Sequence, residues 1–130
     1  MTITFGFYNS YQGDRVYDST QLSSLFDGLI TNGVFMSIGD ALMVSPGVGL
    51  GVNVGSGRAW FDRTWTYNDA PVTLHLDVAD LVLPRIDVVY LETDSATRTN
   101  SIKILAGTPS SDPEPPAMNS VPGDPTQRHP

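Results

Sequence analysis

The two histidines are the side chains best suited to acid–base chemistry at neutral pH, because imidazole titrates near that range. His75 lies in the stretch TLHLD, and His129 lies among the last residues of the chain. Neither has an acid and a nucleophile patterned beside it, so the sequence does not support a hydrolytic triad. Because His75 alternates with Leu74 and Leu76, we predict that it is a strand histidine facing solvent.

Carboxylates are the other abundant reactive groups: 14 Asp and Glu residues against 7 Lys and Arg residues give a net charge of −7. Carboxylate pairs can do acid–base work or bind calcium, but no run matches the calcium-loop pattern D-x-[DN]-x-[DN]-G. Most aspartates fall in turn-like contexts, where their oxygens accept backbone N–H bonds; these include Asp14, Asp69, Asp94 and Asp124. Since phosphate-backbone affinity comes from Lys and Arg, we do not expect a nucleic-acid partner.

The most concentrated chemical feature is the stretch RAWFDRTWTYN, where two arginines, Arg58 and Arg63, are interleaved with aromatic residues. Aromatic rings beside polar groups can stack on sugars or anchor protein interfaces. The alternative is that the two tryptophans belong to the core of a β-hairpin. Alternation places Arg63, Trp65 and Tyr67 on one face, which we predict to be the surface that contacts a partner or ligand.

Arg85 and Asp87 lie two residues apart in RIDVVYLE, on one face of a predicted strand, while Ile86 and Val88 take the other. This spacing predicts a structural ion pair. The chain has no cysteine, so it can form neither a disulfide nor a thiolate metal site. We predict no catalytic residues, no metal, no cofactor and no enzymatic activity.

Most of the chain after Val34 has the pattern of β-strands. Alternating or short apolar runs are separated by Gly, Pro, Asn or Asp, among them LGVNVG, RAWFD, TWTYN, VTLHLDV, IDVVYLET and SIKILAG. The runs lie too close together for crossover helices, so antiparallel hairpins are expected. The opening TITFGFY also predicts a short strand. The glycines of SPGVGLGVNVGSG do not fit a phosphate loop and are better explained by turns.

A single helix is predicted before the strands, in YDSTQLSSLFDGLITNG. Its apolar residues repeat with the spacing of one helical face: Leu22, Leu25, Phe26, Leu29 and Ile30. Asp18, Ser19 or Thr20 can cap its start, and Asn32-Gly33 can end it. The predicted fold class is therefore mainly β (α+β): an antiparallel β-sandwich or barrel-like sheet with one N-terminal amphipathic helix.

Two regions are expected: a single globular β-rich domain over residues 1–107, and a proline-rich extended arm or linker over residues 108–130. Seven of the ten prolines lie in the second region, which has almost no large apolar side chain. Such a composition favours extended or polyproline II conformations. The N-terminus lacks a signal-peptide pattern, and no run of about 20 apolar residues could span a bilayer. We expect a chain made as a soluble protein without a membrane partner.

Three stretches together resemble the N-terminal domain of tail and baseplate structural proteins of tailed bacteriophages, including upper baseplate and receptor-binding components. They are VSPGVGLGVNVGSGRAWFDRTWTYND, LPRIDVVYLETD and SIKILAGTPSSDPEPP, and the similarity covers about residues 1–116. The shared motif consists of Arg85 and Asp87 in the first part and Gly107 and Pro109 in the second. The resemblance implies two adjacent antiparallel strands, RIDVVYLETD and SIKILAGT, and a proline-rich connector. Such proteins usually continue into further strands, so we expect this chain to be a fragment or a compact version.

The resemblance also implies a function: a non-enzymatic tail or baseplate component in the virion, made in the host cytoplasm, which binds other tail or baseplate proteins and forms a homo-oligomer. Two alternatives come from the residues themselves. The size and acidity suit a phage-encoded inhibitor that mimics nucleic acid and blocks a host defence nuclease. The aromatic cluster suits a carbohydrate-binding module that recognises a host surface glycan.

Overall fold

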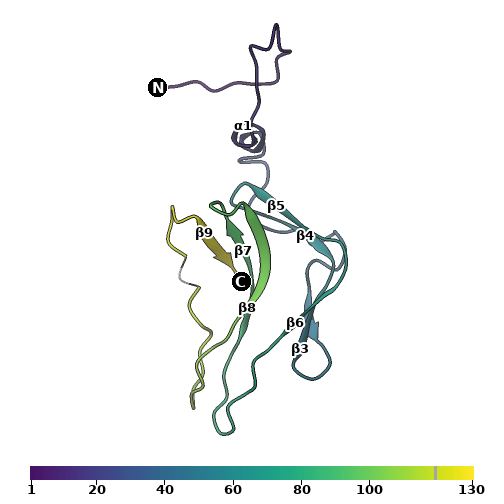
Figure 1. Ribbon diagram of the computed structural model, residues 1–130, viewed down its shortest axis with the longest axis vertical. Helices are drawn as coiled ribbons and strands as arrows, with labels where there is room; N and C mark the ends of the chain where they lie inside the picture. The colour runs from purple at the N-terminus through teal and green to yellow at the C-terminus, as the bar shows by residue number, and fades with distance from the viewer. Residues whose placement is uncertain (119) are drawn as a thin grey trace.

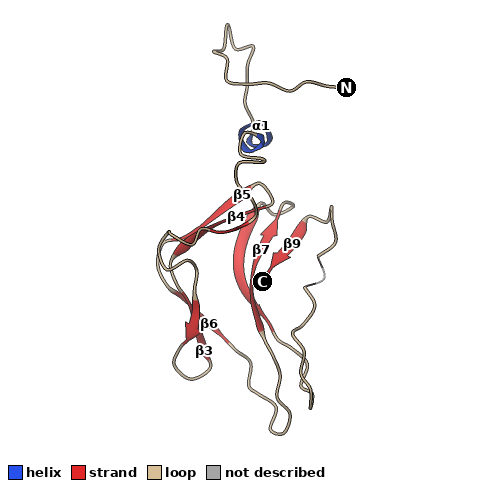
Figure 2. Ribbon diagram, turned by 180° about the vertical axis from the view of Figure 1, so that it is seen from behind, coloured by secondary structure: helices blue, strands red, loops and turns tan. Residues whose placement is uncertain are grey.

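The computed structural model describes residues 1–118 and 120–130. It confirms a mainly β, antiparallel fold with one short N-terminal helix (Figures 1 and 2). The strands form three small sheets with the orders β1-β4-β5, β2-β3-β6 and β8-β7-β9. The elements are α1 (Ser19–Ser24), β1 (Gly33–Val34), β2 (Val44–Pro46), β3 (Gly51–Val54), β4 (Gly57–Phe61), β5 (Thr64–Asn68), β6 (Val72–His75), β7 (Val88–Asp94), β8 (Thr99–Leu105) and β9 (Thr126–His129).

The first two sheets are the two halves of one long, bent ribbon. Strand β3 continues into β4 after two residues, and β5 continues into β6 after three, so the same two chain segments pair in both halves. The ribbon closes at a two-residue turn, where Asp62 and Arg63 both have positive φ values of 52° and 63°. This left-handed pair gives the turn the twist that an antiparallel hairpin requires.

The loop between β1 and β2 packs against the bend of this ribbon. The backbone N–H groups of Asp40 and Leu42 both donate to the carbonyl of Ser56, at 2.8 and 3.1 Å. Contact is so close that a Cβ atom on Gly55 would lie 2.7 Å from the Cβ of Asp40. The glycine-rich stretch therefore serves turns and close backbone packing, as the sequence indicates.

The third sheet contains a strand that the sequence does not predict. After β8 the described residues of the proline-rich segment form neither helix nor strand until β9, which pairs with β7 from Leu91↔His129 to Asp94↔Thr126. Strand β7 is thus central, with β8 on its other side over seven residue pairs. Asn119, within the predicted arm, lies outside the described residues.

The core lies where the β4-β5 half of the ribbon packs on the third sheet. Ala59 is fully buried between them, and Leu91 on the central strand is also buried. The polar atoms at this contact are paired: the Nδ2 atom of Asn100 donates to the hydroxyl oxygens of Thr64 and Thr66, both at 2.9 Å. The core is small, because the buried apolar residues among those described are Val54, Ala59, Trp60, Tyr90 and Leu91.

The predicted N-terminal strand is wrong: TITFGFY forms neither helix nor strand and is exposed along its length. The predicted helix does form, but it spans only Ser19–Ser24, while its expected apolar face reaches Ile30. Its start agrees with the sequence, since Asp18 accepts the N–H of Gln21 at 2.8 Å and the Gln21 side chain returns to the Asp18 N–H in a capping box. We call residues 1–18 the N-terminal arm; with α1 it projects beyond the sheets (Figures 1 and 2).

Candidate functional site

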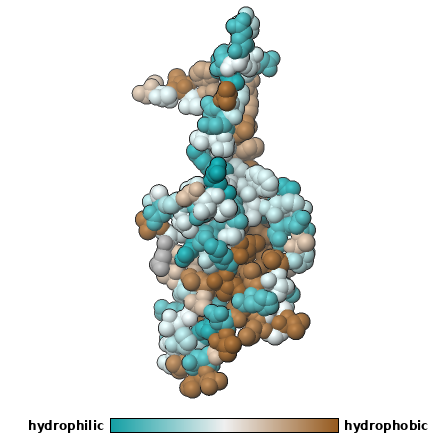
Figure 3. Space-filling view, in the orientation of Figure 1, coloured by the Kyte–Doolittle hydropathy of each residue, from teal (hydrophilic) through white to brown (hydrophobic). Residues whose placement is uncertain are grey.

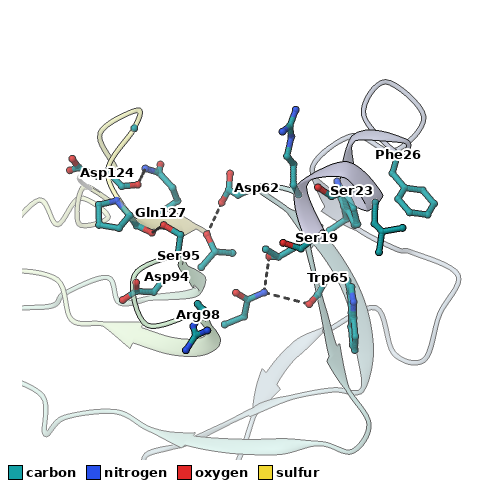
Figure 4. A pocket seen from close by; sticks show the side chains of 18 of the residues that line it. Ser19, Ser23, Phe26, Asp62, Trp65, Asp94, Ser95, Arg98, Asp124 and Gln127 are labelled. Carbon is teal, nitrogen blue, oxygen red and sulfur yellow. Dashed lines mark hydrogen bonds between the residues drawn. The ribbon is translucent and has the colours of Figure 1, made fainter. Parts of the chain in front are cut away.

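Three turns and helix α1 surround an open groove of about 1260 Å³ at one end of the sheets. The turns are the β4–β5 turn, the β7–β8 turn and the residues just before β9, so they join segments far apart in the sequence. Figure 4 shows side chains from all three turns lining this space. We call it the tip groove. Turns at one end of a sheet structure are common positions for binding residues.

Most polar groups of the tip groove already bind one another. Asp62 is the centre: its Oδ2 atom accepts the hydroxyl of Thr93 at 2.7 Å and lies 2.6 Å from Nε2 of His129. The side-chain nitrogen of Gln127 donates to the carbonyls of Val121 and Asp124 at 2.7 and 3.0 Å. The His129 contact ties β9 to the β4–β5 turn, and the Gln127 bonds hold the segment just before β9 against that strand.

His129 has a clear structural role that its place in the tail does not reveal. Its ring stacks on Phe61, with centroids 4.1 Å apart and planes at 14°, while Nε2 contacts Asp62. The neighbouring hydroxyl of Thr93 donates to the same Asp62 carboxylate and not to the His129 ring. Thr93 is therefore not placed as a nucleophile that His129 could activate. The contact explains how a polar tetrapeptide is held as a strand. His75, by contrast, is exposed on β6.

The free side chains of the tip groove are mainly apolar. Trp65 is 68% exposed and lies opposite Trp60, which is buried under the ring of Phe26 at a centroid distance of 5.7 Å. Leu22 of α1 is also exposed beside them. The groove therefore has a wall made of Leu22, Phe26 and Trp65, which we call the apolar wall.

The three predicted contact residues do not share a single face. Trp65 and Tyr67 lie on the same side of β5, and Arg58 stacks on Tyr67 with its guanidinium carbon 4.1 Å from the ring centroid. Arg63 sits in the turn instead, where it forms an ion pair with Asp27 at the end of the α1 region. Arg63 therefore anchors the N-terminal region to the body, while Trp65 and Tyr67 form the exposed aromatic surface.

The motif residues Arg85, Asp87, Gly107 and Pro109 lie next to each other at the end of the third sheet opposite the tip groove. We call them the RID and GTP motif, after the one-letter sequences of residues 85–87 and 107–109. Arg85 donates to Asp87 at 2.9 Å and to the carbonyls of Asp77 and Val78 at 2.7 and 3.0 Å. Asp87 in turn accepts the N–H of Gly107 at 2.9 Å. Pro109 lies shortly after the end of β8. The N–H of the next residue, Ser110, donates to the Pro84 carbonyl at 3.0 Å. The motif holds two loops to the sheet.

The charge of Asp87 is stabilised by these contacts. Burial alone would raise the pKa of Asp87, but hydrogen bonds from Arg85 and from the Gly107 N–H outweigh it, so the pKa lies below its usual value. A group whose pKa is lower in the folded state contributes stability above its unfolded value of about 3.9, and this contribution is lost as pH falls through the folded value. The motif is therefore a source of acid sensitivity.

We expect Arg85→Lys to lower the free energy of unfolding by about 2 kcal/mol, because an ammonium cannot reproduce the bonds of the guanidinium to Asp87 and two carbonyls at once. Urea denaturation followed by tryptophan fluorescence measures this loss. Arg98→Lys is the matched control, since Arg98 lies exposed in the β7–β8 turn. An unchanged midpoint for Arg85→Lys would show that charge alone suffices there.

Groups of acidic, histidine or cysteine side chains able to hold a metal ion are absent from the described residues. Helices long and apolar enough to cross a membrane are likewise absent from residues 1–118 and 120–130. Comparison with protein-family models, with curated proteins and with solved structures found no match to this chain.

Proposed function

We propose that this chain is a non-enzymatic structural component of a bacteriophage tail or baseplate and that it acts by assembling with other protein chains, including copies of itself. The virion context rests on the sequence resemblance around the RID and GTP motif. The assembly role is supported by one structural observation, which is that the chain leaves most of its apolar side chains uncovered.

The accessible surface of the chain is 9427 Å². A compact monomer of 14.0 kDa is expected to expose about 6,700 Å². The excess of about 2,700 Å² is larger than the roughly 800 Å² that each partner contributes to a standard protein–protein interface. An isolated chain of this shape would keep a large apolar area in water, which favours association.

The uncovered apolar residues are grouped and not scattered. One group follows the N-terminal arm and α1, and another lies around the loop before the RID motif, where Val78, Leu81 and Val82 are exposed. Figure 3 shows apolar side chains over the middle of one face and at the lower end of the body. Exposed apolar patches of this extent are typical of protein contact surfaces.

The same observations give less support to the two alternatives. A nucleic-acid mimic needs carboxylates free on its surface, whereas several here serve local structure: Asp80 and Asp94 accept backbone N–H groups in turns, and Asp40 binds Ser56. A glycan site needs converging polar groups beside its aromatic rings. In the tip groove many such groups already bind one another, and the free face of Trp65 lies beside Leu22 and Phe26.

We expect the purified chain to sediment as a defined oligomer that dissociates on dilution, because burial of the excess surface requires other copies. Analytical ultracentrifugation over a wide range of concentration measures this. A single species of 14 kDa at every concentration, together with failure to bind any tail protein encoded beside it, would contradict the proposed function.

A further inference from the structure

The N-terminal arm has the pattern of a strand but no strand beside it. Ile3, Phe5 and Phe7 alternate with smaller or polar residues, so an extended backbone places all three on one face. All three are well exposed. Among the described residues, the hydrogen bonds and ring contacts of the arm stay inside residues 1–22. They join Tyr8 to Tyr17, Tyr11 to Asp14, Asp18 to Gln21 and Leu22, Phe5 to Tyr8, Phe7 to Tyr17 and Arg15 to Phe5 and Tyr8.

The tip groove offers a surface that matches this apolar face. Its polar groups around Asp62 and Gln127 bind within the chain, and the charged side chains of Arg98 and Asp124 lie across from the apolar wall, which is open to solvent. An apolar segment therefore fits the groove better than a charged or sugar-like one. Trp65 in particular offers a large ring surface against which Phe5 or Phe7 can pack.

The position of the arm favours exchange between copies. The arm ends at Asp18, and the wall of the tip groove begins at Ser19 of the same chain. Two copies that face each other at their grooves therefore place each arm beside the groove of the other. Such a contact uses the same two surfaces on both chains, as a two-fold symmetric interface requires.

We propose that the tip groove of each chain binds the N-terminal arm of a second copy, with Ile3, Phe5 and Phe7 packed on Leu22, Phe26 and Trp65. This inference rests on the proposed function, because it names the partner and the surface through which the chain associates. It also accounts for the large exposed area of the arm, which no other part of the chain covers within the described residues.

The absence of cysteine allows a direct test in the full-length chain. One sample carries Ile3→Cys, on the face of the arm that packs in the groove, and the other carries Ser23→Cys, which lies in the groove lining; the two are mixed under mild oxidation. Disulfide formation requires Cα atoms within about 7 Å, so a mixed dimer reports that the arm of one chain lies in the groove of another. We expect this mixed dimer to dominate over either homodimer.

The control mixes Ile3→Cys with Val48→Cys, since Val48 is exposed in the β2–β3 turn away from the groove. We expect little mixed dimer there. Sedimentation of the triple variant Ile3→Ser, Phe5→Ser, Phe7→Ser separates the arm inference from the proposed assembly role. If wild type is oligomeric and this variant is equally oligomeric, or if the groove cysteine links no better than the control, the arm inference is overturned and the assembly role stands. If wild type is monomeric, the arm inference fails, and the proposed function fails with it only when the chain also binds no tail protein encoded beside it.

Discussion

Gly107→Ala is expected to be the most damaging single substitution in the chain, with a loss of about 4 kcal/mol in the free energy of unfolding. An added Cβ atom would overlap the carbonyl oxygen of Ile86 and lie 3.0 Å from its carbonyl carbon. Both obstacles are backbone atoms that cannot rotate away. Relief would require the strand exit to move, which would break the bond from the Gly107 N–H to Asp87.

Urea denaturation of Gly107→Ala beside Thr108→Ala measures this effect. Thr108 is exposed and adjacent, so its truncation is expected to change stability by no more than about 0.5 kcal/mol. Gly107→Ala is also expected to weaken the acid sensitivity attributed to Asp87, since that carboxylate would lose a donor. Equal stability of the two variants would show that the RID and GTP contact is not required by the fold.

The strands that the sequence predicts correctly are those whose partner lies nearby in the chain. RAWFD and TWTYN form β4 and β5 around a two-residue turn, and the runs around Tyr90 and Ile102 form β7 and β8. In these hairpins the alternation of side chains and the short turn both indicate the same antiparallel pairing of two adjacent segments. Local pattern and tertiary contact agree, so the sequence is sufficient.

Strand β9 could not be predicted because its sequence carries no such pattern. Thr126–His129 is polar throughout and follows a proline-rich segment. It forms a strand because its backbone pairs with the free edge of β7. In addition, Arg128 pairs with the carboxylate of Glu92 and His129 with that of Asp62, both far away in the chain. The tip groove could not be predicted for the same reason, because its turns are far apart in the sequence and come together only in the folded chain.

The N-terminal prediction fails for the opposite reason. TITFGFY and the apolar spacing from Leu22 to Ile30 are strong local patterns, yet within the chain most of their side chains stay exposed, and Phe26 on Trp60 is the main contact with the sheets. Helices and strands gain most of their stability from such packing, so the strand is absent and the helix is short. Under the proposed arm exchange, the missing surface belongs to another copy.

Glu92→Ala is the second large effect, with an expected loss of about 3 kcal/mol. Glu92 is buried on the central strand, where its two oxygens bind Lys103 on β8 at 2.6 Å and Arg128 on β9 at 3.2 Å. Removing the carboxylate leaves two cations facing each other across β7. Because β9 pairs with β7 over four residues and β8 over seven, we expect β9 to detach first and residues 108–130 to become sensitive to proteolysis.

The pH dependence separates charge from packing at this position. The hydrogen bond from Lys103 lowers the pKa of Glu92; burial opposes this, and Arg128 lowers it further. The stabilisation is therefore present above the unfolded value of about 4.3 and disappears as pH falls through the lower folded value. Glu92→Gln should retain the packing, lose part of the stability at neutral pH and show a flatter acid limb than wild type. Glu114→Ala, at an exposed glutamate in the proline-rich segment, should change neither quantity. An acid limb unaltered in Glu92→Gln would assign the acid sensitivity to the other carboxylates with lowered pKa values, which are Asp80, Asp87 and Asp94.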